Sequence, residues 1–417
     1  MAATVFKGGS ARANHCMAVG FSLPGDQQKL ISSRNLGETD TICYDVAIAG
    51  GGLGGLCAAI ILAKSGRKVI LFEKDQYPFH RVCGEYISME SYAFVTDLGV
   101  DLKLLEASSI SRLQITGMKG ESLEQKLPLG GFGISRFRLD QQLAVLAQDN
   151  GALLKENTRV NDIHFSDGTF RIETSAGEFF ARVVCGSFGK RSNIDIKWKR
   201  PFALAAKNKL NNYIGIKYHV RLPNFPEDQI ALHIFPNGYC GIVKIEGDDY
   251  NLCYLTTADN LKRCAGSISK MEKRILSRNP ALSNILQELE SQLNSPVTIS
   301  QISFSRKTQV EEHVLMIGDA AGMITPLCGN GMSMAMHASK LATIEIEQFL
   351  SGSCSRLEME TNYSRKWKQH FSARLKTGRT IQRLFGHPLL TRLLIQLSTI
   401  FPKIGARLIR LTHGKPF

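Results

Sequence analysis

A glycine-rich turn between a strand and a helix constrains the fold of this chain more than any other feature. The turn carries the pattern GxGxxG at Gly50, Gly52 and Gly55, directly after the apolar run 44–49 (YDVAIA). Residues 56–65 are then apolar on nearly every side, as in a helix that is buried against a sheet. This arrangement predicts the first strand and the helix of a βαβ unit.

The same unit indicates what the turn binds. Glycines allow a tight turn and let a pyrophosphate approach the helix N-terminus, whose N–H groups and dipole favour an anion. A second apolar run, 68–72, ends at Glu73, which is placed to accept a hydrogen bond from a ribose hydroxyl. Ala59 supplies the small side chain that close packing of helix on strand needs. The unit therefore predicts a dinucleotide site, to which we also assign Leu53, Gly54 and Lys74.

The pattern of apolar runs and turns changes after residue 213. Between residues 213 and 255, apolar runs such as YIGIKYHV and ALHIF alternate with Pro-Asn-Gly and Gly-Asp-Asp turns, which indicates an antiparallel sheet. Residues 314–317 return to the pattern of a buried strand, so the nucleotide fold resumes there. A chain of 417 residues is long enough to form two domains.

The predicted fold class is α/β, with a Rossmann-like nucleotide-binding domain, an inserted antiparallel β-sheet substrate domain and a C-terminal helical tail. Residues 1–42 lack periodicity and are expected to form a flexible extension. The other predicted parts are the nucleotide-binding domain at 43–107, 129–200 and 297–352, the substrate domain at 108–128 and 201–296, and the tail at 353–417.

From Tyr44 to about Leu350 the chain resembles the class A flavoproteins built like para-hydroxybenzoate hydroxylase, which also include the geranylgeranyl reductases and flavin-dependent halogenases. In that group a Gly-Asp pair after a late strand binds the ribityl and pyrophosphate part of FAD, and Gly318 and Asp319 match it. The resemblance implies that the cofactor is FAD and that the substrate is an apolar small molecule.

A second stretch of the resemblance lies at the start of the following helix. There Pro326, Gly329, Asn330 and Gly331 match the loop and helix start that face the flavin pyrimidine ring in the family. Reduced flavin is anionic around N1 and O2, and a helix N-terminus stabilises such a charge. These four residues are therefore expected to contact the flavin.

The segment FHRVCGEYIS, which begins at Phe79, resembles the Cys-Gly-Glu segment of geranylgeranyl-reductase-like proteins. The resemblance implies that Arg81 lies near the FAD phosphates, and that Cys83 and Glu85 lie near the flavin ring as candidate catalytic residues. A buried cysteine is more often inert packing, so a packing role for Cys83 stays open.

The segment SRFRLD matches a family pattern that puts Arg136 near the cofactor, with Arg138 as the competing candidate. Aromatic hydroxylases carry an Asp-Gly signature that bears on both FAD and NADPH, and this chain has Phe188 in place of the Asp. NAD(P)H is the expected electron donor, provided that its use does not require this Asp. Halogenases carry a WxWxIP signature, and the nearest segment here, 235–242, contains no tryptophan. Halogenation is therefore set aside.

Three functions are considered, and the sequence favours the first of them. The first is a monooxygenase, in which reduced FAD and O2 form a C4a-hydroperoxide that hydroxylates an apolar aromatic or unsaturated lipid-like substrate. The second is a geranylgeranyl-reductase-like enzyme that saturates isoprenoid C=C bonds, favoured by the Cys-Gly-Glu segment and disfavoured by the absence of a YxWxFP string. The third is a non-catalytic flavin-binding protein, which the intact segment 329–331 disfavours.

The net charge of +14 is concentrated at the end of the chain, because residues 361–417 hold twelve Lys and Arg and no acidic residue. Basic and aromatic residues do not interleave there, so we expect no nucleic acid as partner. Apolar residues from Leu389 to Leu411 recur at helical spacing around Pro402. Two hypotheses follow: the tail packs on its own core, or it covers the substrate pocket and contacts an anionic membrane surface.

Ten cysteines occur without a CxxC pair or a zinc-ligand spacing, which indicates reduced thiols and no metal. No apolar run reaches the length of about 18 residues that a membrane-spanning helix needs. The expected location is the cytoplasm, with peripheral contact to a membrane through the tail.

Overall fold

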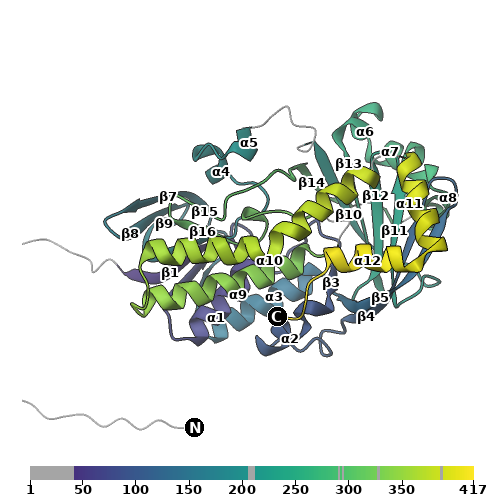
Figure 1. The fold of residues 1–417 in the computed structure, drawn as a ribbon. Helices are drawn as coiled ribbons and strands as arrows, with labels where there is room; N and C mark the ends of the chain where they lie inside the picture. The colour runs from purple at the N-terminus through teal and green to yellow at the C-terminus, as the bar shows by residue number, and fades with distance from the viewer. Residues whose placement is uncertain (1–41, 205–211, 290–291, 294, 326–328, 386–387) are drawn as a thin grey trace, which may run out of the picture. The chain divides into compact units, whose positions relative to one another are not determined.

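Two eight-stranded sheets organise the chain in the computed structural model, which describes residues 42–204, 212–289, 292–293, 295–325, 329–385 and 388–417 (Figure 1). The extension 1–41 lies outside the described residues. The two sheets and the helices from Ile42 to Phe417 form one compact unit.

Sheet A contains the predicted βαβ unit. Strand β1 pairs in parallel with β2 on one side and with β9 on the other, and β16 pairs in parallel with β9. Helix α1 packs against α3 and α9. The elements are β1 (Cys43–Ala49), α1 (Leu53–Lys64), β2 (Val69–Phe72), α3 (Arg136–Asp149), β6 (Leu153–Lys155), β7 (Val160–Ser166), β8 (Thr169–Thr174), β9 (Gly177–Gly186), β15 (Val310–Glu311), β16 (Val314–Met316) and α9 (Gly331–Leu350).

Sheet B has the strand order β14-β10-β13-β12-β11-β4-β5-β3. Every neighbouring pair is antiparallel except β4 and β11. Together with sheet A, it confirms the predicted fold class. The strands are β3 (Tyr86–Ser88), β4 (Ser108–Thr116), β5 (Ser122–Gly133), β10 (Tyr213–Arg221), β11 (Gln229–Phe235), β12 (Gly238–Lys244), β13 (Asp249–Thr257) and β14 (Val297–Ile302).

Some strands of sheet B fall in residue ranges predicted to belong to the nucleotide-binding domain. Strands β3 and β14, and the end of β5, pair within sheet B although the ranges place them in the nucleotide-binding part. The chain therefore crosses between the two sheets more often than its apolar runs indicate, because short strands leave little periodicity in a sequence. The division into domains stays a prediction.

The two faces of sheet B have different partners. The outer face packs under α7 (Ile268–Arg274) and α8 (Pro280–Glu288), where Met271 and Leu282 join its core. On the inner face, Lys217, Cys253, Gly241, Leu232 and Ile115 stand side by side across five strands. Paired residues of neighbouring strands project from the same face, so this row forms one continuous surface.

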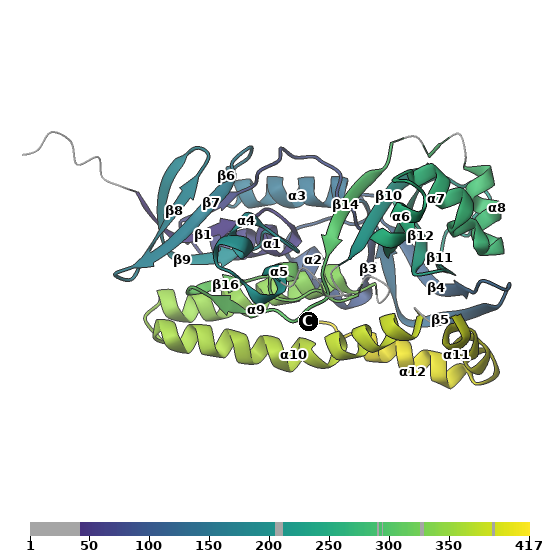
Figure 2. The same cartoon turned by 90° about the horizontal axis from the view of Figure 1, so that it is seen from above.

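Three helices complete the chain and confirm the predicted helical tail: α10 (Arg356–Phe385), α11 (Pro388–Ile400) and α12 (Pro402–Thr412). Helix α10 packs on α9, and α11 and α12 both contact β5, so the tail lies along one side of both sheets (Figure 2). The last residue, Phe417, stacks on His337 with ring centroids 4.2 Å apart and also contacts Phe94. The end of the tail is therefore part of the core.

The remaining helices are short: α2 (Tyr92–Asp97), α4 (Asn193–Lys197), α5 (Pro201–Leu204) and α6 (Ala258–Arg263). Within the described ranges, we find no helix with enough length and apolar character to cross a membrane.

A buried histidine on the outer face predicts acid sensitivity. His233 of β11 is 1% exposed, its Nδ1 lies 2.8 Å from the Thr116 hydroxyl, and burial lowers its pKa to about 4. Between pH 6.5 and pH 4 the unfolded chain therefore binds a proton that the folded chain does not. We expect this group to cost about 3 kcal/mol of unfolding free energy as the pH falls through that window. Urea unfolding at pH 7 and pH 4 measures it.

The matched control replaces the half-exposed His164. His233→Gln should remove most of this acid-induced loss, while His164→Gln should leave it in place. Equal pH slopes for the two variants would contradict the assignment.

Candidate functional site

The three motif glycines meet different surroundings. Gly50 has φ +106°, and a Cβ there would lie 2.5 Å from the Ser187 carbonyl oxygen. A Cβ at Gly55 would collide with the Gly50 carbonyl oxygen. At Gly52 the backbone has φ −77°, and a Cβ would meet only the Ser187 oxygen, at 3.9 Å. The fold therefore requires glycine at 50 and 55, whereas the space in front of Gly52 is open.

That open space lies at the N-terminus of α1. Gly52 is the N-cap residue and offers no side-chain cap, and the first turn of the helix contains no acidic residue. The first N–H groups of the helix lack intrahelical acceptors and can bind an anion. The turn fits a pyrophosphate, as the sequence predicts.

Glu73 fixes the turn from the end of β2. Its carboxylate, which is 3% exposed, accepts a hydrogen bond from the Gly51 N–H at 3.0 Å and pairs with Arg81 at 2.8 Å. The hydroxyl of Tyr77 donates to the Gly51 carbonyl. Arg81 therefore lies beside the turn, as the resemblance implies. Lys74 instead points to the surface, where it pairs with Asp75 at 3.0 Å.

The Gly-Asp motif packs against the same turn. A Cβ at Gly54 would lie 2.6 Å from the side chain of Ile317, the residue before Gly318. Lys307 donates to the carbonyl oxygens of Lys190 and Asp319, each at 2.7 Å, and so ties this motif to the loop after β9. Burial lowers the pKa of Lys307 to about 8.

Helix α9 begins beside this motif. Gly318, Asp319 and Gly331 line one small pocket. The N-terminus of α9 carries no side-chain cap and no acidic residue in its first turn, so its N–H groups can bind an anion. Asn330 is fully buried, and its side chain donates to the Thr412 carbonyl at 2.7 Å. Pro326 lies outside the described residues. The three predicted cofactor motifs therefore meet at one place.

The Cys-Gly-Glu segment lies at the same helix start. The Cys83 sulfur is 3.5 Å from the sulfur of Met332 in α9, and burial raises the pKa of the Cys83 thiol. Gly329, with φ +64°, packs against the ring of Tyr86. Cys83 is thus a partly buried thiol beside the predicted flavin contacts, and its part in catalysis stays a prediction.

Glu85 is a buried anion that binds Lys217, His219 and one backbone N–H. Its carboxylate accepts hydrogen bonds from Lys217 at 2.5 Å and His219 at 2.7 Å, and also from the Arg136 N–H at 2.7 Å. Burial acts to raise the pKa of Glu85, but these partners outweigh it and hold the pKa below its ordinary value. Glu85 is therefore ionised at neutral pH and is not poised to donate a proton.

The two candidate arginines of the segment 135–140 differ in burial. The Arg136 guanidinium lies inside this cluster and forms a bidentate pair with Asp140 at 2.6 and 2.7 Å. Arg138 lies at the surface and pairs with Glu106 at 3.2 Å. The position of Arg136 agrees with the predicted role near the cofactor, and the role itself remains a prediction.

Sequence reasoning missed Lys217, His219 and Lys307. A signal existed for the first two, because Lys217 and His219 alternate within the apolar run YIGIKYHV and must share one face of a strand. Polar residues on the buried face of a strand point to a functional or paired group. Lys307 lies in an irregular segment and carries no such signal.

A large apolar cavity lies between the inner face of sheet B and the tail helices. It holds about 850 Å³ of space that protein atoms do not fill, part of it open to solvent, and its lining includes Tyr86 and Gly329 beside the loop predicted to face the flavin. The sheet contributes Leu113, Ile115, Leu123, Leu127, Ile230 and Leu232, and the tail contributes Ile381, Leu394, Ile395, Ser398, Gly405, Leu408, Ile409, Thr412 and His413. The tail thus covers a pocket, as one of the two hypotheses predicts.

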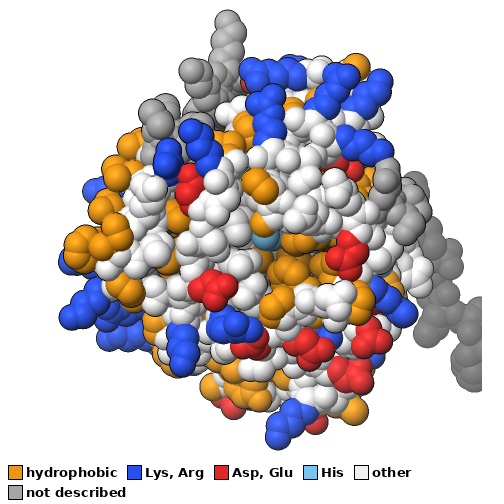
Figure 3. All heavy atoms as spheres, turned by 90° about the vertical axis from the view of Figure 1, so that its right-hand side faces the viewer, with side chains coloured by type: hydrophobic (Ala, Val, Ile, Leu, Met, Phe, Trp, Pro, Cys, Tyr) orange, Lys and Arg blue, Asp and Glu red, His pale blue; other side chains and the backbone are white. Residues whose placement is uncertain are grey.

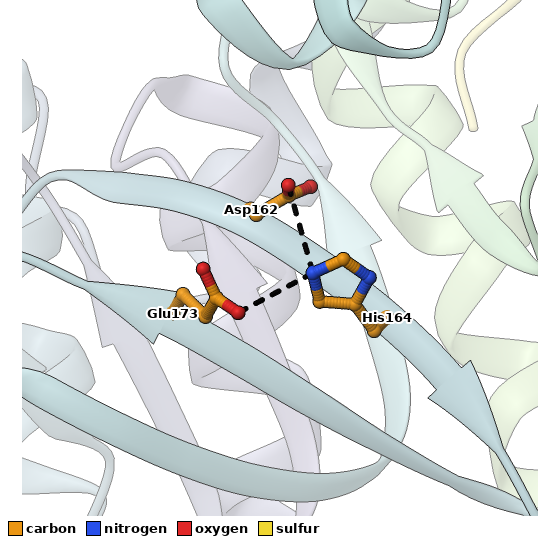
Figure 4. A group of neighbouring side chains, drawn as sticks. All are labelled: Asp162, His164 and Glu173. Carbon is orange, nitrogen blue, oxygen red and sulfur yellow. Dashed lines mark ion pairs between the residues drawn. The ribbon is translucent and has the colours of Figure 1, made fainter.

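A separate polar group, Asp162, His164 and Glu173, gathers on the hairpin of β7 and β8 (Figure 4). Lys197 pairs with Asp162 at 2.9 Å, and Arg171 pairs with Glu173 at 3.0 Å. Because both carboxylates already have a cation partner, the group is a surface ion network.

Asp319 offers a direct test of the second motif. Its side chain is partly exposed, and the described part of the chain supplies no hydrogen bond or ion pair to its carboxylate. We expect Asp319→Ala to weaken FAD binding by roughly 10- to 100-fold, the range for loss of a charged hydrogen bond, with little change in the melting temperature of the apoprotein. Fluorescence titration with FAD measures the affinity. A large loss of apoprotein stability at unchanged affinity would instead show that Asp319 caps the turn.

Comparisons with known proteins agree with this geometry. A family model described as an FAD binding domain matches residues 45–80. Conditioned medium factor receptor 1 of Dictyostelium discoideum is 27% identical over 348 residues, which cover 75% of this chain and 65% of the receptor. Digeranylgeranylglycerophospholipid reductase of Methanocaldococcus jannaschii is 26% identical over 345 residues, covering 78% of this chain and 82% of that enzyme.

Solved structures share the fold. PqsL of P. aeruginosa in complex with 2-aminobenzoylacetate has a TM-score of 0.71 at 14% identity, covering 84% of this chain and 98% of PqsL. A geranylgeranyl bacteriochlorophyll reductase-like protein from Thermoplasma acidophilum has a TM-score of 0.69 at 18% identity, covering 89% of this chain and all of that protein. The likeness predicted from the motifs is confirmed at the level of the fold.

Proposed function

Because the chain has the fold of the FAD-dependent oxidoreductases of the para-hydroxybenzoate hydroxylase and geranylgeranyl reductase superfamily, we propose that it is a flavoenzyme acting on an unsaturated, lipid-like substrate. The reaction that its geometry supports best is the saturation of isoprenoid C=C bonds. The observation that carries this proposal is the aliphatic cavity that ends at Tyr86 and Gly329.

The side chains that line the cavity favour the binding of a hydrocarbon chain. Its lining consists mainly of leucine and isoleucine and contains no Asp, Glu, Lys or Arg from the described residues. Each buried CH2 group contributes about 0.8 kcal/mol, so a single five-carbon isoprene unit gains about 4 kcal/mol. A charged headgroup would lose its hydration inside such a space. We therefore expect the chain of the lipid to enter and its headgroup to stay outside.

FAD, when bound, supplies the hydride for this chemistry. Gly52, Glu73 and Asp319 would hold its phosphate and sugar parts, and the N-terminus of α9 would face its ring. Saturation also needs a proton, and the cavity lining offers two titratable side chains within the described residues, Tyr86 and His413. Burial raises the pKa of Tyr86 and lowers that of His413, so both are neutral near pH 7. The Tyr86 hydroxyl already donates to the Gly130 carbonyl at 3.2 Å, and its raised pKa makes it a weaker acid, so water is the proposed source of the proton.

A second candidate is hydroxylation of the same class of substrate, which the sequence analysis puts first. It is favoured by the lack of a carboxylic acid in the cavity lining, because oxygen transfer to a bound substrate needs positioning and the exclusion of water more than a strong acid. NAD(P)H is the proposed electron donor for both reactions.

The products separate the two reactions. The holoenzyme, reduced with dithionite, is given geranylgeraniol either without oxygen or with it, and the products are analysed by mass spectrometry. Gain of two hydrogens per double bond without oxygen supports saturation, whereas gain of one oxygen atom only in air supports hydroxylation. Failure on polyprenyl substrates, together with turnover of a small soluble aromatic, would overturn the assignment of the cavity.

A cavity variant provides the control. Leu113→Trp fills the space between sheet and tail and should abolish turnover while FAD stays bound, and Leu104→Trp, which adds the same ring at an exposed position, should be silent.

A further inference from the structure

Helix α11 is apolar on two opposite faces. Leu394 and Ile395 on its inner face line the cavity. On its outer face Leu393, Leu397 and Ile400 recur at helical spacing and are exposed, Ile400 by 67%. A helix that only packs on its own core needs one apolar face, so the outer face requires a separate explanation.

Helix α12 continues the outer surface. We call the exposed apolar side chains of the two helices the α11–α12 strip, and it comprises Leu390, Leu393, Leu397, Ile400, Phe401, Ile404 and Leu411. On the face turned toward the viewer in Figure 3, hydrophobic and basic side chains gather along the left edge, where these helices lie. Singly exposed apolar residues are common, whereas a contiguous strip marks an interaction surface.

The charge beside the strip identifies its partner. Lys403, Arg407, Arg410 and Lys415 are exposed, and in the described part of the chain none of them forms an ion pair. Residues 361–417 contain no acid that could neutralise them. Exposed apolar side chains flanked by uncompensated positive charge complement an anionic lipid surface, where the side chains enter the interface and the cations meet the headgroups.

We infer that the α11–α12 strip docks the protein on an anionic bilayer, and that the cavity directly beneath it receives its substrate from that bilayer. Residues on the inner face of the same two helices line the cavity, so a lipid chain needs to pass only the thickness of one helical layer. The docking step is inferred from the exposed side chains of α11 and α12 alone, whereas the delivery step also rests on the proposed function.

Vesicle binding tests the docking step without any turnover. The holoenzyme is sedimented with phosphatidylglycerol or phosphatidylcholine vesicles at low and high salt. We expect binding to phosphatidylglycerol alone, weakened by salt, and a roughly 100-fold loss for Lys403→Gln/Arg407→Gln/Arg410→Gln, because each basic residue contributes about fivefold. The control, Lys262→Gln/Arg263→Gln/Lys270→Gln, removes the same charge from α6 and α7 and should bind normally.

A second pair of substitutions tests the apolar part. Ile400→Ser/Phe401→Ser should weaken vesicle binding at least tenfold and leave the protein monodisperse. Point variants are required, because truncation would also remove Phe417 from the core. Equal binding by the two charge variants, no binding of the wild type, or conversion of a dimer to a monomer by Ile400→Ser/Phe401→Ser would overturn docking. If the wild type docks as expected but the non-docking variants turn over vesicle-embedded geranylgeraniol as fast as the wild type does, delivery alone is overturned.

Discussion

Gly52→Val is expected to give a folded protein that does not bind FAD, with the affinity reduced by at least about 100-fold, or ~2.7 kcal/mol. The backbone of Gly52 has φ −77°, which any residue adopts, and a Cβ there meets no protein atom closer than 3.9 Å. The valine side chain would instead fill the open space at the N-terminus of α1. Steric exclusion of the pyrophosphate is therefore the largest expected change.

The contrasting variant is Gly55→Val. A Cβ at Gly55 collides with the Gly50 carbonyl and lies 3.1 Å from the Ser187 hydroxyl, so this substitution should destabilise the protein itself. Flavin absorbance of the purified proteins and thermal unfolding of the apoproteins separate the two effects. If Gly52→Val purifies with full flavin occupancy, the turn does not bind the pyrophosphate.

The βαβ unit could be predicted because its contacts are local. Glu73 reaches the Gly51 N–H over a separation of 22 residues, and strand, turn and helix each leave their own pattern in the sequence. The Gly-Asp motif and the start of α9 could be located for the same reason. Each is a short segment whose backbone conformation dictates its residues, such as the positive φ of Gly318 and Gly329.

The environment of Glu85 could not be predicted in this way. Its partner Lys217 lies 132 residues farther along the chain, and only the register of β10 within sheet B brings the two together. The cavity has the same origin, because its walls come from β4, β5 and β11 on one side and from the tail on the other. Periodicity shows that a helix has an apolar face but not which surface that face covers.

The tail illustrates this limit. The sequence left open whether its apolar residues pack on the core or cover a pocket and meet a membrane. Ile395 and Phe417 pack inward, whereas Leu393 and Ile400 are exposed on the other side. The inward residues pack on the core as the first hypothesis predicts, and some of them also line the pocket that the second hypothesis requires. Contact with a membrane remains a proposal.

The buried cluster around Glu85 leads to the second large effect. We expect Glu85→Gln to lower the free energy of unfolding by about 3–5 kcal/mol, because it leaves the ammonium of Lys217, which is 1% exposed, without a carboxylate. Replacing both partners should restore most of the loss, since Glu85→Gln/Lys217→Met no longer buries an unpaired charge. The exposed pair of Asp228 and Arg112 is the control, where Asp228→Asn should cost less than about 1 kcal/mol.

Denaturant unfolding of the four proteins gives the energies, and turnover of the double variant shows what the cluster is for. If Glu85 serves only to balance Lys217 and hold it on the inner face of sheet B, the stable double variant keeps its activity. If Glu85 acts on the cofactor or the substrate, the double variant is stable, binds FAD and is inactive. A loss for Glu85→Gln no larger than that for Asp228→Asn would contradict the buried ion pair, because an unpaired ammonium cannot be buried at so small a cost.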